Sequence, residues 1–334
     1  MNPPLIPLAS ILSIIAIVLA VDPGHFAFAY VDAGGHTLRM LISGHGQPAV
    51  VFETGGSPGS GGVLESWERV QPAVSALTMT VSYDRAGVGW SAPGPQPRDA
   101  RQVARELHIA MQNAGVPPPY VLVGHSFGGP LNRVFAGMYP GEVCGVVLAD
   151  PTQEEFIAWD RARDPNHAER NNAEWQETKA SLDEAHSSAL PSGIPVVLIT
   201  GMGPKTLPGF ISQKDQQDYR TAHQMWLKFH QEWLDNIPGA QHTITEKTGH
   251  GIPFLEPELV VNAISNVIVK AKKSPVAPPK SARDIPLSQS HHAGHAEGFG
   301  QRLILCGTAS DNTAASRSAL EDVSNPPPSS SSGR

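Results

Sequence analysis

A serine in this chain stands in a pattern that suits nucleophilic catalysis. Residues 124–129 read GHSFGG and directly follow the apolar run YVLV at residues 120–123. A short strand, a tight Gly-x-Ser-x-Gly turn and a helix describe a nucleophile elbow, which projects the serine hydroxyl away from the sheet. Glycine on both sides of the serine makes so tight a turn possible. The pattern therefore predicts that Ser126 acts as a nucleophile.

A serine hydroxyl needs a neighbouring base to take its proton at neutral pH. Among the fourteen histidines, His250 has the position that suits this role best. It lies in the segment KTGHG, between the last expected strand (residues 242–246) and the last expected helix (residues 258–270). Loops at the carboxyl edge of a parallel sheet converge on one crevice, so His250 can reach the serine. The chain order Ser then His also agrees with a nucleophile elbow of this kind.

A catalytic histidine needs an acidic partner that holds its tautomer and stabilises its imidazolium. The loop after the expected strand at residues 195–200 is a common place for this acid, but it reads GMGPKT and has no carboxylate. Asp215 and Asp218 come later, inside an expected helix. Asp150 ends the preceding strand at the same edge of the sheet, and we expect it to be the acid. The alternative is that Asp150 only caps the first turn of the segment that follows.

Two backbone N–H groups are expected to hold the oxyanion that forms when the serine attacks a carbonyl. One donor is the N–H of Phe127, the residue after the nucleophile. The other is expected from the glycine-rich loop TGGS at residues 54–57, where the backbone can approach a ligand closely. Gly56 is the preferred donor, and a shift of one residue would give Gly55 or Ser57.

Strand and helix patterns alternate between residues 29 and 271, which predicts a mostly parallel, doubly wound sheet with helices on both faces. Residues 151–193 are polar, helical in tendency and without a strand pattern, so we expect them to form a small helical cap. The expected strands cover residues 29–32, 37–43, 49–53, 77–83, 120–123, 145–149, 195–200 and 242–246. The expected helices cover residues 63–75, 99–114 and 258–270, the segment after the elbow, and a later segment with Tyr219, Trp226, Phe229 and Trp233 at helical spacing, which we expect to pack in the core or the cap.

The two ends of the chain differ from this middle. Residues 5–21 are apolar and uncharged, which suits the core of a signal peptide or a short membrane anchor, although residues 1–5 contain no Lys or Arg. We therefore expect residues 1–28 to direct export or membrane association, and a cytoplasmic location if they do not. Residues 272–334 are rich in Pro, Ser, Ala and Gly, a composition typical of disordered tails.

The overall composition argues against several functional classes. The formal net charge of -7 is unlike that of a nucleic-acid-binding surface. Two cysteines cannot form a disulfide framework. His291, His292 and His295 have no acidic or cysteine ligands directly beside them, so we expect neither a metal nor a cofactor. The composition leaves the oligomeric state open.

With these motifs in order, residues 36–270 resemble the α/β-hydrolase fold superfamily. The segment SYDRAGVGWS at residues 82–91 looks like the Asp-Arg-x-Gly-x-Gly-x-Ser segment of that superfamily, whose role there is mainly structural. Some members place the catalytic acid at the end of the strand after the elbow helix, where this chain has Asp150. Many relatives have a His-Gly pair where this chain has Glu53 and Thr54. This difference leaves open which residue of the glycine-rich loop supplies the oxyanion donor.

The resemblance and the residues together predict a serine hydrolase that cleaves a carboxylic ester-like bond of a small molecule through an acyl-enzyme. One alternative is an amide- or proline-cleaving peptidase of the same fold. Another is a catalytically silent, hydrolase-like binding domain. A dehalogenase or an epoxide hydrolase would need a carboxylate at the elbow, where this chain has Ser126.

Overall fold

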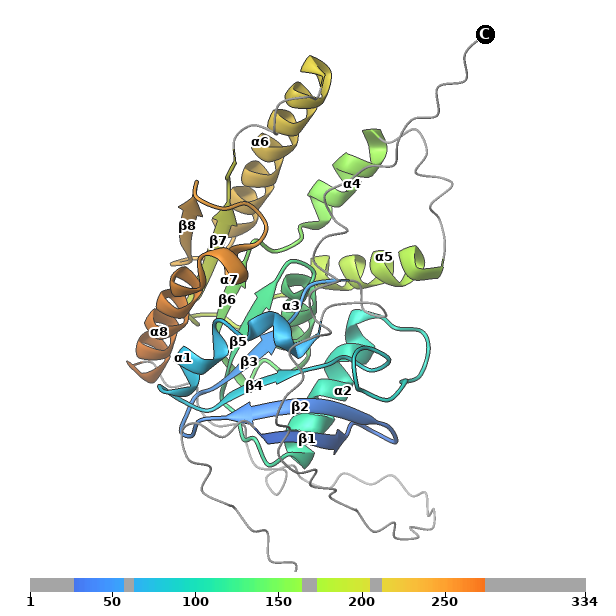
Figure 1. Ribbon diagram of the computed structural model, residues 1–334, viewed down its shortest axis with the longest axis vertical. Coiled ribbons are helices and arrows are strands. Elements are labelled where there is room, and N and C mark those ends of the chain that lie inside the picture. The colour runs from blue at the N-terminus through green and yellow to red at the C-terminus, as the bar shows by residue number, and fades with distance from the viewer. Residues whose placement is uncertain (1–26, 57–62, 164–172, 205–211, 274–334) are drawn as a thin grey trace, which may run out of the picture. The chain divides into compact units, whose positions relative to one another are not determined.

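The computed structural model describes residues 27–56, 63–163, 173–204 and 212–273, which belong to one compact unit of the chain. Within them, eight strands form one sheet in the order β1-β2-β4-β3-β5-β6-β7-β8 (Figure 1). The pairs that β2 forms with β1 and β4 are antiparallel, and the later neighbours pair in parallel. The strands are β1 (Ala27–Asp32), β2 (Thr37–Ser43), β3 (Ala49–Glu53), β4 (Thr80–Tyr83), β5 (Tyr120–His125), β6 (Val143–Ala149), β7 (Val196–Gly201) and β8 (Gln241–Thr245).

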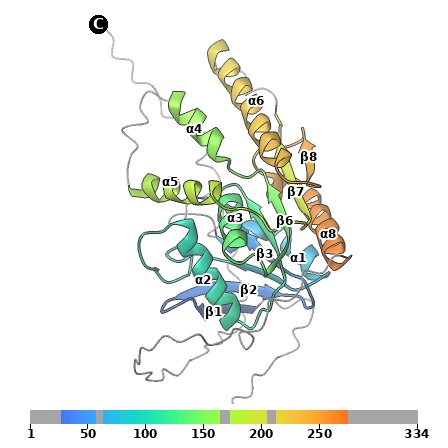
Figure 2. The ribbon, with the colours of Figure 1, turned by 180° about the vertical axis from the view of Figure 1, so that it is seen from behind.

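Helices cover both faces of this sheet, as Figures 1 and 2 show from opposite sides. Helices α2 and α3 pack on one face, and α1 and α8 pack on the other. The predicted fold class, a doubly wound and mostly parallel sheet, is confirmed. The helices are η1 (Leu64–Trp67), α1 (Gln71–Ser75), α2 (Ala100–Asn113), α3 (Gly128–Met138), α4 (Glu154–Arg163), α5 (Ala173–His186), α6 (Gln213–Asp235), α7 (Ile252–Leu255) and α8 (Pro257–Lys273).

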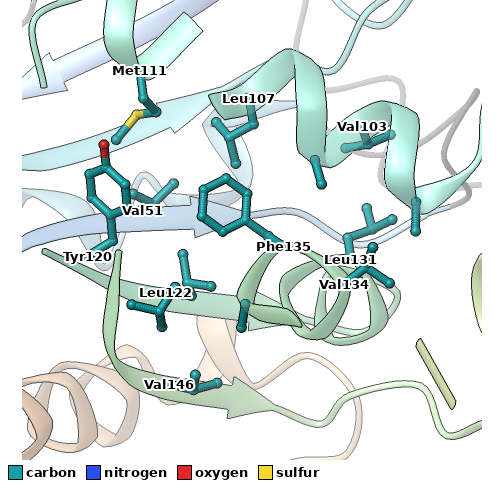
Figure 3. Close-up of a cluster of buried hydrophobic side chains, with 14 of the residues drawn as sticks. Val51, Val103, Leu107, Met111, Tyr120, Leu122, Leu131, Val134, Phe135 and Val146 are labelled. Carbon is teal, nitrogen blue, oxygen red and sulfur yellow. The ribbon is translucent and has the colours of Figure 1, made fainter. Parts of the chain in front are cut away.

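The two hydrophobic cores follow from the alternation of side chains along the central strands. In β5, Tyr120 and Leu122 face the core shared with α2 and α3, whereas Val121 and Val123 face the core under α8. Figure 3 shows the first core, where Phe135 of α3 lies between helix α2 and the sheet. Because the central strands are apolar on both faces, they are buried throughout, and their carboxyl ends are held in fixed positions.

Two local predictions were wrong. The helix expected at residues 63–75 is divided into η1 and α1, because Pro72 lies in the first turn of α1 and has no N–H for a continuous helix. The strand expected from residue 77 begins at Thr80, since the N–H groups of Leu77 and Thr78 bond to the carbonyl of Val74 and extend the last turn of α1. By contrast, Asp99 caps α2 as expected, accepting the N–H of residue 102 at 2.8 Å.

Helices α4 and α5 lie within the segment expected to form the cap, between β6 and β7. Helix α6 follows β7 and packs against α4. Strand β1 begins at Ala27, so the expected N-terminal segment overlaps it by two residues. The apolar run at residues 5–21 and the tail from residue 274 lie outside the described residues, and their roles stay predictions. Within the described ranges, no helix has the length and apolar character needed to cross a membrane.

Candidate active site

Ser126 occupies the sharp turn between β5 and α3. Its φ angle is +54°, in the left-handed region that residues other than glycine seldom adopt, and such strain is common at functional turns. A Cβ at Gly124 would lie 2.6 Å from the carbonyl oxygen of Gly128, and a Cβ at Gly128 would lie 2.5 Å from that of Glu53. Both glycines are therefore required by close backbone contact, as the motif predicted.

Asp150 and Ser126 follow two neighbouring strands at the same edge of the sheet. His125 and Ala149, the last residues of β5 and β6, are register partners. The residues that follow them, Ser126 and Asp150, therefore lie side by side. Asp150 is only 2% exposed and also has a positive φ, +47°. This placement brings Asp150 to the edge from which the elbow projects.

His250 reaches Asp150 from the loop after β8, although 100 residues separate the two in sequence. Nδ1 of His250 lies 2.8 Å from Oδ2 of Asp150. Because a carboxylate can only accept hydrogen bonds, Nδ1 carries a proton, so the neutral form of this ring has its lone pair on Nε2. This is the tautomer that can take a proton from a hydroxyl group.

The other oxygen of Asp150 is also held. Oδ1 accepts the N–H of Gly201 at 2.9 Å and the indole N–H of Trp226 at 2.8 Å. Burial alone would raise the pKa of Asp150, but the hydrogen bonds and charge of its neighbours, His250 first, hold that pKa below its ordinary value. Asp150 is therefore ionised at neutral pH and fixed at both oxygens.

The two later carboxylates are engaged elsewhere. Asp215 forms a capping box with Ser212 at the start of α6. Asp218 pairs on the surface with Lys214 and Arg163. The structure thus brings Asp150 to His250 and leaves Asp215 and Asp218 in helix α6 with other partners.

The glycine-rich loop after β3 packs directly on the elbow. A Cβ at Gly55 would lie 3.0 Å from Cβ of Ser126. On its other side, the guanidinium of Arg85 donates to the carbonyl oxygens of Thr54, Gly55 and Gly56 at 2.9, 2.8 and 3.2 Å. In a planar trans peptide the N–H points opposite to the carbonyl. The N–H groups of Gly55 and Gly56 therefore point away from Arg85.

Arg85 is itself held by a buried network. Its Nη1 lies 2.6 Å from Oε1 of Glu53, and Oε2 of the same carboxylate accepts a hydrogen bond from the hydroxyl of Tyr83. Burial raises the pKa of Glu53, and the adjacent Arg85 charge opposes this rise. Glu53, the departure from the His-Gly pair of many relatives, thus serves as counter-ion to Arg85. A carboxylate at the end of a wholly apolar strand was the sequence signal for this pair.

A separate cavity of about 590 Å³ lies between α6 and the loop before β7. Its lining includes Arg133, Phe229 and Trp233 but neither Ser126 nor His250. Within the described part of the chain, no group of three or more His, Cys, Asp or Glu side chains is arranged to hold a metal ion.

Comparisons with known proteins agree with this architecture. The family model of the alpha/beta hydrolase fold matches residues 48–195. YqjL of Bacillus subtilis is 26% identical over 226 residues, which are 65% of this chain and 82% of YqjL. RutD of Azorhizobium caulinodans, whose name assigns it provisionally to carbamate hydrolysis, is 29% identical over 121 residues, which are 36% of this chain and 43% of RutD. The crystal structure of VinJ matches with a TM-score of 0.52 and 18% identity, over 73% of this chain and 99% of VinJ.

The sheet order, the elbow turn at Ser126 and these matches lead to one classification. The strand order places the elbow after a central parallel strand. The family model spans that strand, the elbow and the strand that ends before Asp150. The chain therefore has the α/β-hydrolase fold, and its residues 48–195 match the family model of that fold.

Proposed function

We propose that this protein is a serine hydrolase that cleaves a carboxylic ester-like bond of a small molecule through an acyl-enzyme. The observation that carries the proposal is the 2.8 Å hydrogen bond between Nδ1 of His250 and the buried carboxylate of Asp150. This pair lies at the sheet edge from which Ser126 projects. The match of residues 48–195 to the alpha/beta hydrolase family model supports the reaction class.

In the first half-reaction, Oγ of Ser126 attacks the carbonyl carbon of the substrate while Nε2 of His250 takes the hydroxyl proton. Asp150 stabilises the imidazolium that results. When the tetrahedral intermediate collapses, the bond to the leaving alcohol breaks and His250 returns its proton to the alcohol oxygen. The acyl group is then an ester of Ser126.

The negative charge of the tetrahedral intermediate needs donors that are already in position. We assign this role to the N–H groups of Phe127 and Gly56. The N–H of Gly56 points away from Arg85, and its loop packs on Ser126, which supports the assignment. In the second half-reaction, His250 activates a water molecule that hydrolyses the acyl-enzyme, releases the acid and restores Ser126.

The proposed triad needs one more contact, between Ser126 and His250. Within the described residues, no hydrogen bond joins the hydroxyl of Ser126 to His250, whose side chain is 55% exposed. Catalytic hydrogen bonds often form fully only when the substrate is bound.

The test is a panel of p-nitrophenyl esters, lactones, p-nitroanilides, carbamates and aminoacyl substrates, assayed with the wild type and with Ser126→Ala. We expect ester cleavage in the wild type and a loss of at least about 10³-fold in kcat/KM in the variant. Preferential cleavage of the amides or carbamates would assign a different substrate class to the same serine mechanism. Full ester activity in Ser126→Ala would contradict the proposal.

A further inference from the structure

The hydrogen bonds on Asp150 come from three separate parts of the fold. His250 binds Oδ2 from the loop after β8, and the backbone N–H of Gly201 binds Oδ1 from β7. The third donor is the indole N–H of Trp226, 2.8 Å from Oδ1. Trp226 belongs to α6, which lies outside the sheet. A helix outside the sheet is therefore bonded directly to the acid that orients the proposed base.

Trp226 also connects the cap helix α4 to this acid–base pair. The ring of Phe156, from α4, packs edge-on against Trp226 with centroids 4.7 Å apart and an interplanar angle of 87°. The ring of His250 lies edge-on on another side, with centroids 6.3 Å apart. A shift of α4 or α6 would therefore move the indole that holds Asp150.

One turn further along α6, His230 fixes the helix at the same place. Nε2 of His230 lies 2.8 Å from the carbonyl oxygen of Pro151, the residue after Asp150. Its Nδ1 lies 2.7 Å from the hydroxyl of Thr200, which precedes Gly201 in β7. His230 and Thr200 are both fully buried. Helix α6 is thus held at two successive turns: Trp226 bonds to the side chain of Asp150, and His230 bonds to the backbone of Pro151.

We propose that Trp226 is a positioning residue for hydrolysis. Its N–H holds the carboxylate of Asp150 in the orientation that directs His250, and it makes that orientation depend on the placement of α4 and α6. The inference rests on the proposed function, because it assigns His250 and Asp150 to catalysis. The spacing of aromatic residues in α6 predicts packing in the core or the cap. Trp226 in addition donates a hydrogen bond to Asp150.

The decisive variant is Trp226→Phe, which keeps a ring against Phe156 and removes the N–H. Trp233→Phe is the matched control, since Trp233 lies on the same helix but packs on Arg133 and lines the separate cavity. The full chain is assayed with a p-nitrophenyl ester for kcat and KM. Proton NMR follows the low-field resonance of the Nδ1–H that joins His250 to Asp150. Replacement of Trp226 by benzothienylalanine, which has the shape of tryptophan without the N–H, serves if Trp226→Phe does not fold.

We expect Trp226→Phe to lower kcat about tenfold, as for loss of one hydrogen bond to a charged group, with KM changed less than about twofold. The low-field resonance should move or broaden, and Trp233→Phe should change neither readout. Wild-type kcat and an unchanged resonance in Trp226→Phe would overturn the inference. So would equal losses in both variants, or a rise in KM alone, because these indicate packing or binding. Failure of the proposed function is seen separately, as a wild type that is inactive or a Ser126→Ala variant that is fully active.

Discussion

Nε2 of His125 lies 2.7 Å from the carbonyl oxygen of His250, so the residue before the proposed nucleophile holds the loop that carries the proposed base. The ring centroids of His125 and His250 are 4.8 Å apart. Burial, followed by the charge of His250, lowers the pKa of His125 to about 4. His125 is therefore neutral at neutral pH and can donate its Nε2 proton to this carbonyl. The link fixes His250 relative to Ser126 through a single side chain.

Loss of this link should slow catalysis without weakening substrate binding. We expect His125→Phe, which fills the buried site but donates no hydrogen bond, to lower kcat about tenfold and leave KM within about twofold. His108→Phe is the control, because His108 stacks on Tyr139 away from the site. Steady-state kinetics on one ester compares the two variants. A His125→Phe variant with wild-type kcat would show that the link does not position His250.

The Arg85 contacts predict a second effect on kcat. Arg85→Lys keeps a positive charge beside Glu53 but loses the planar group that binds three carbonyl oxygens of the glycine-rich loop. The N–H of Gly56 would lose its fixed direction, and kcat should fall about 10²-fold, as when one oxyanion donor is lost.

Arg98→Lys is the matched control for Arg85→Lys. Arg98 is equally buried and pairs with Glu106, away from the elbow. Both variants should unfold at lower temperature, since each disturbs a buried ion pair. Calorimetry and kinetics together separate the two effects. Equal losses of kcat in both variants would refute a specific role of Arg85 in holding the loop.

Stability should fall in mild acid because of buried histidines. Burial lowers the pKa of His230 from 6.5 to about 4. Below pH 6.5 the unfolded chain takes up a proton that the folded protein refuses, so the free energy of unfolding decreases as the pH falls towards 4. His125, whose pKa is lowered in the same way, also decreases the free energy of unfolding as the pH falls. Each histidine should lower stability by about 2 kcal/mol between pH 7 and pH 5.

Urea unfolding of the wild type and of His230→Gln at pH 7 and pH 5 measures the contribution of His230 to this loss of stability. Gln can bond to Pro151 and Thr200 but does not titrate. We expect the loss of stability between the two pH values to be smaller in His230→Gln by about 2 kcal/mol. The same loss in both proteins would show that His230 is not the titrating group.

The identity of the acid has its own test. Asp150→Asn should lower kcat by up to about 10⁴-fold, because an amide no longer holds the required tautomer of His250 or stabilises its imidazolium. Asp215→Asn and Asp218→Asn should keep wild-type kcat, since Asp215 bonds to Ser212 and Asp218 pairs with Lys214 and Arg163, away from His250. Loss of activity in either control, with Asp150→Asn active, would reassign the acid.

Much of this fold could be predicted because its signals are local. The apolar strands, the glycine-bracketed turn at Ser126 and the cap of α2 at Asp99 each depend on neighbouring residues. Asp150 and His250 could be indicated because both follow strands that end at one edge of the sheet. The break at Pro72 is also local, but the helical pattern around it concealed it.

The supports of the site could not be predicted in the same way. Arg85 meets the glycine-rich loop, and Trp226 meets Asp150, through contacts between segments about 30 and 76 residues apart. Nothing in their local pattern states which partner each will have. Packing of the whole chain decides these contacts, and they distinguish a serine in a plausible turn from an organised site.

The central claim is that Ser126 is a nucleophile activated by His250 and Asp150. A fluorophosphonate probe, followed by mass spectrometry of the digested protein, measures this directly, because the probe forms a covalent bond with an activated serine. We expect labelling at Ser126 in the wild type, none there in Ser126→Ala, and much slower labelling in Asp150→Asn. Labelling of a different residue in the wild type, or equal rates in the wild type and Asp150→Asn, would contradict the account.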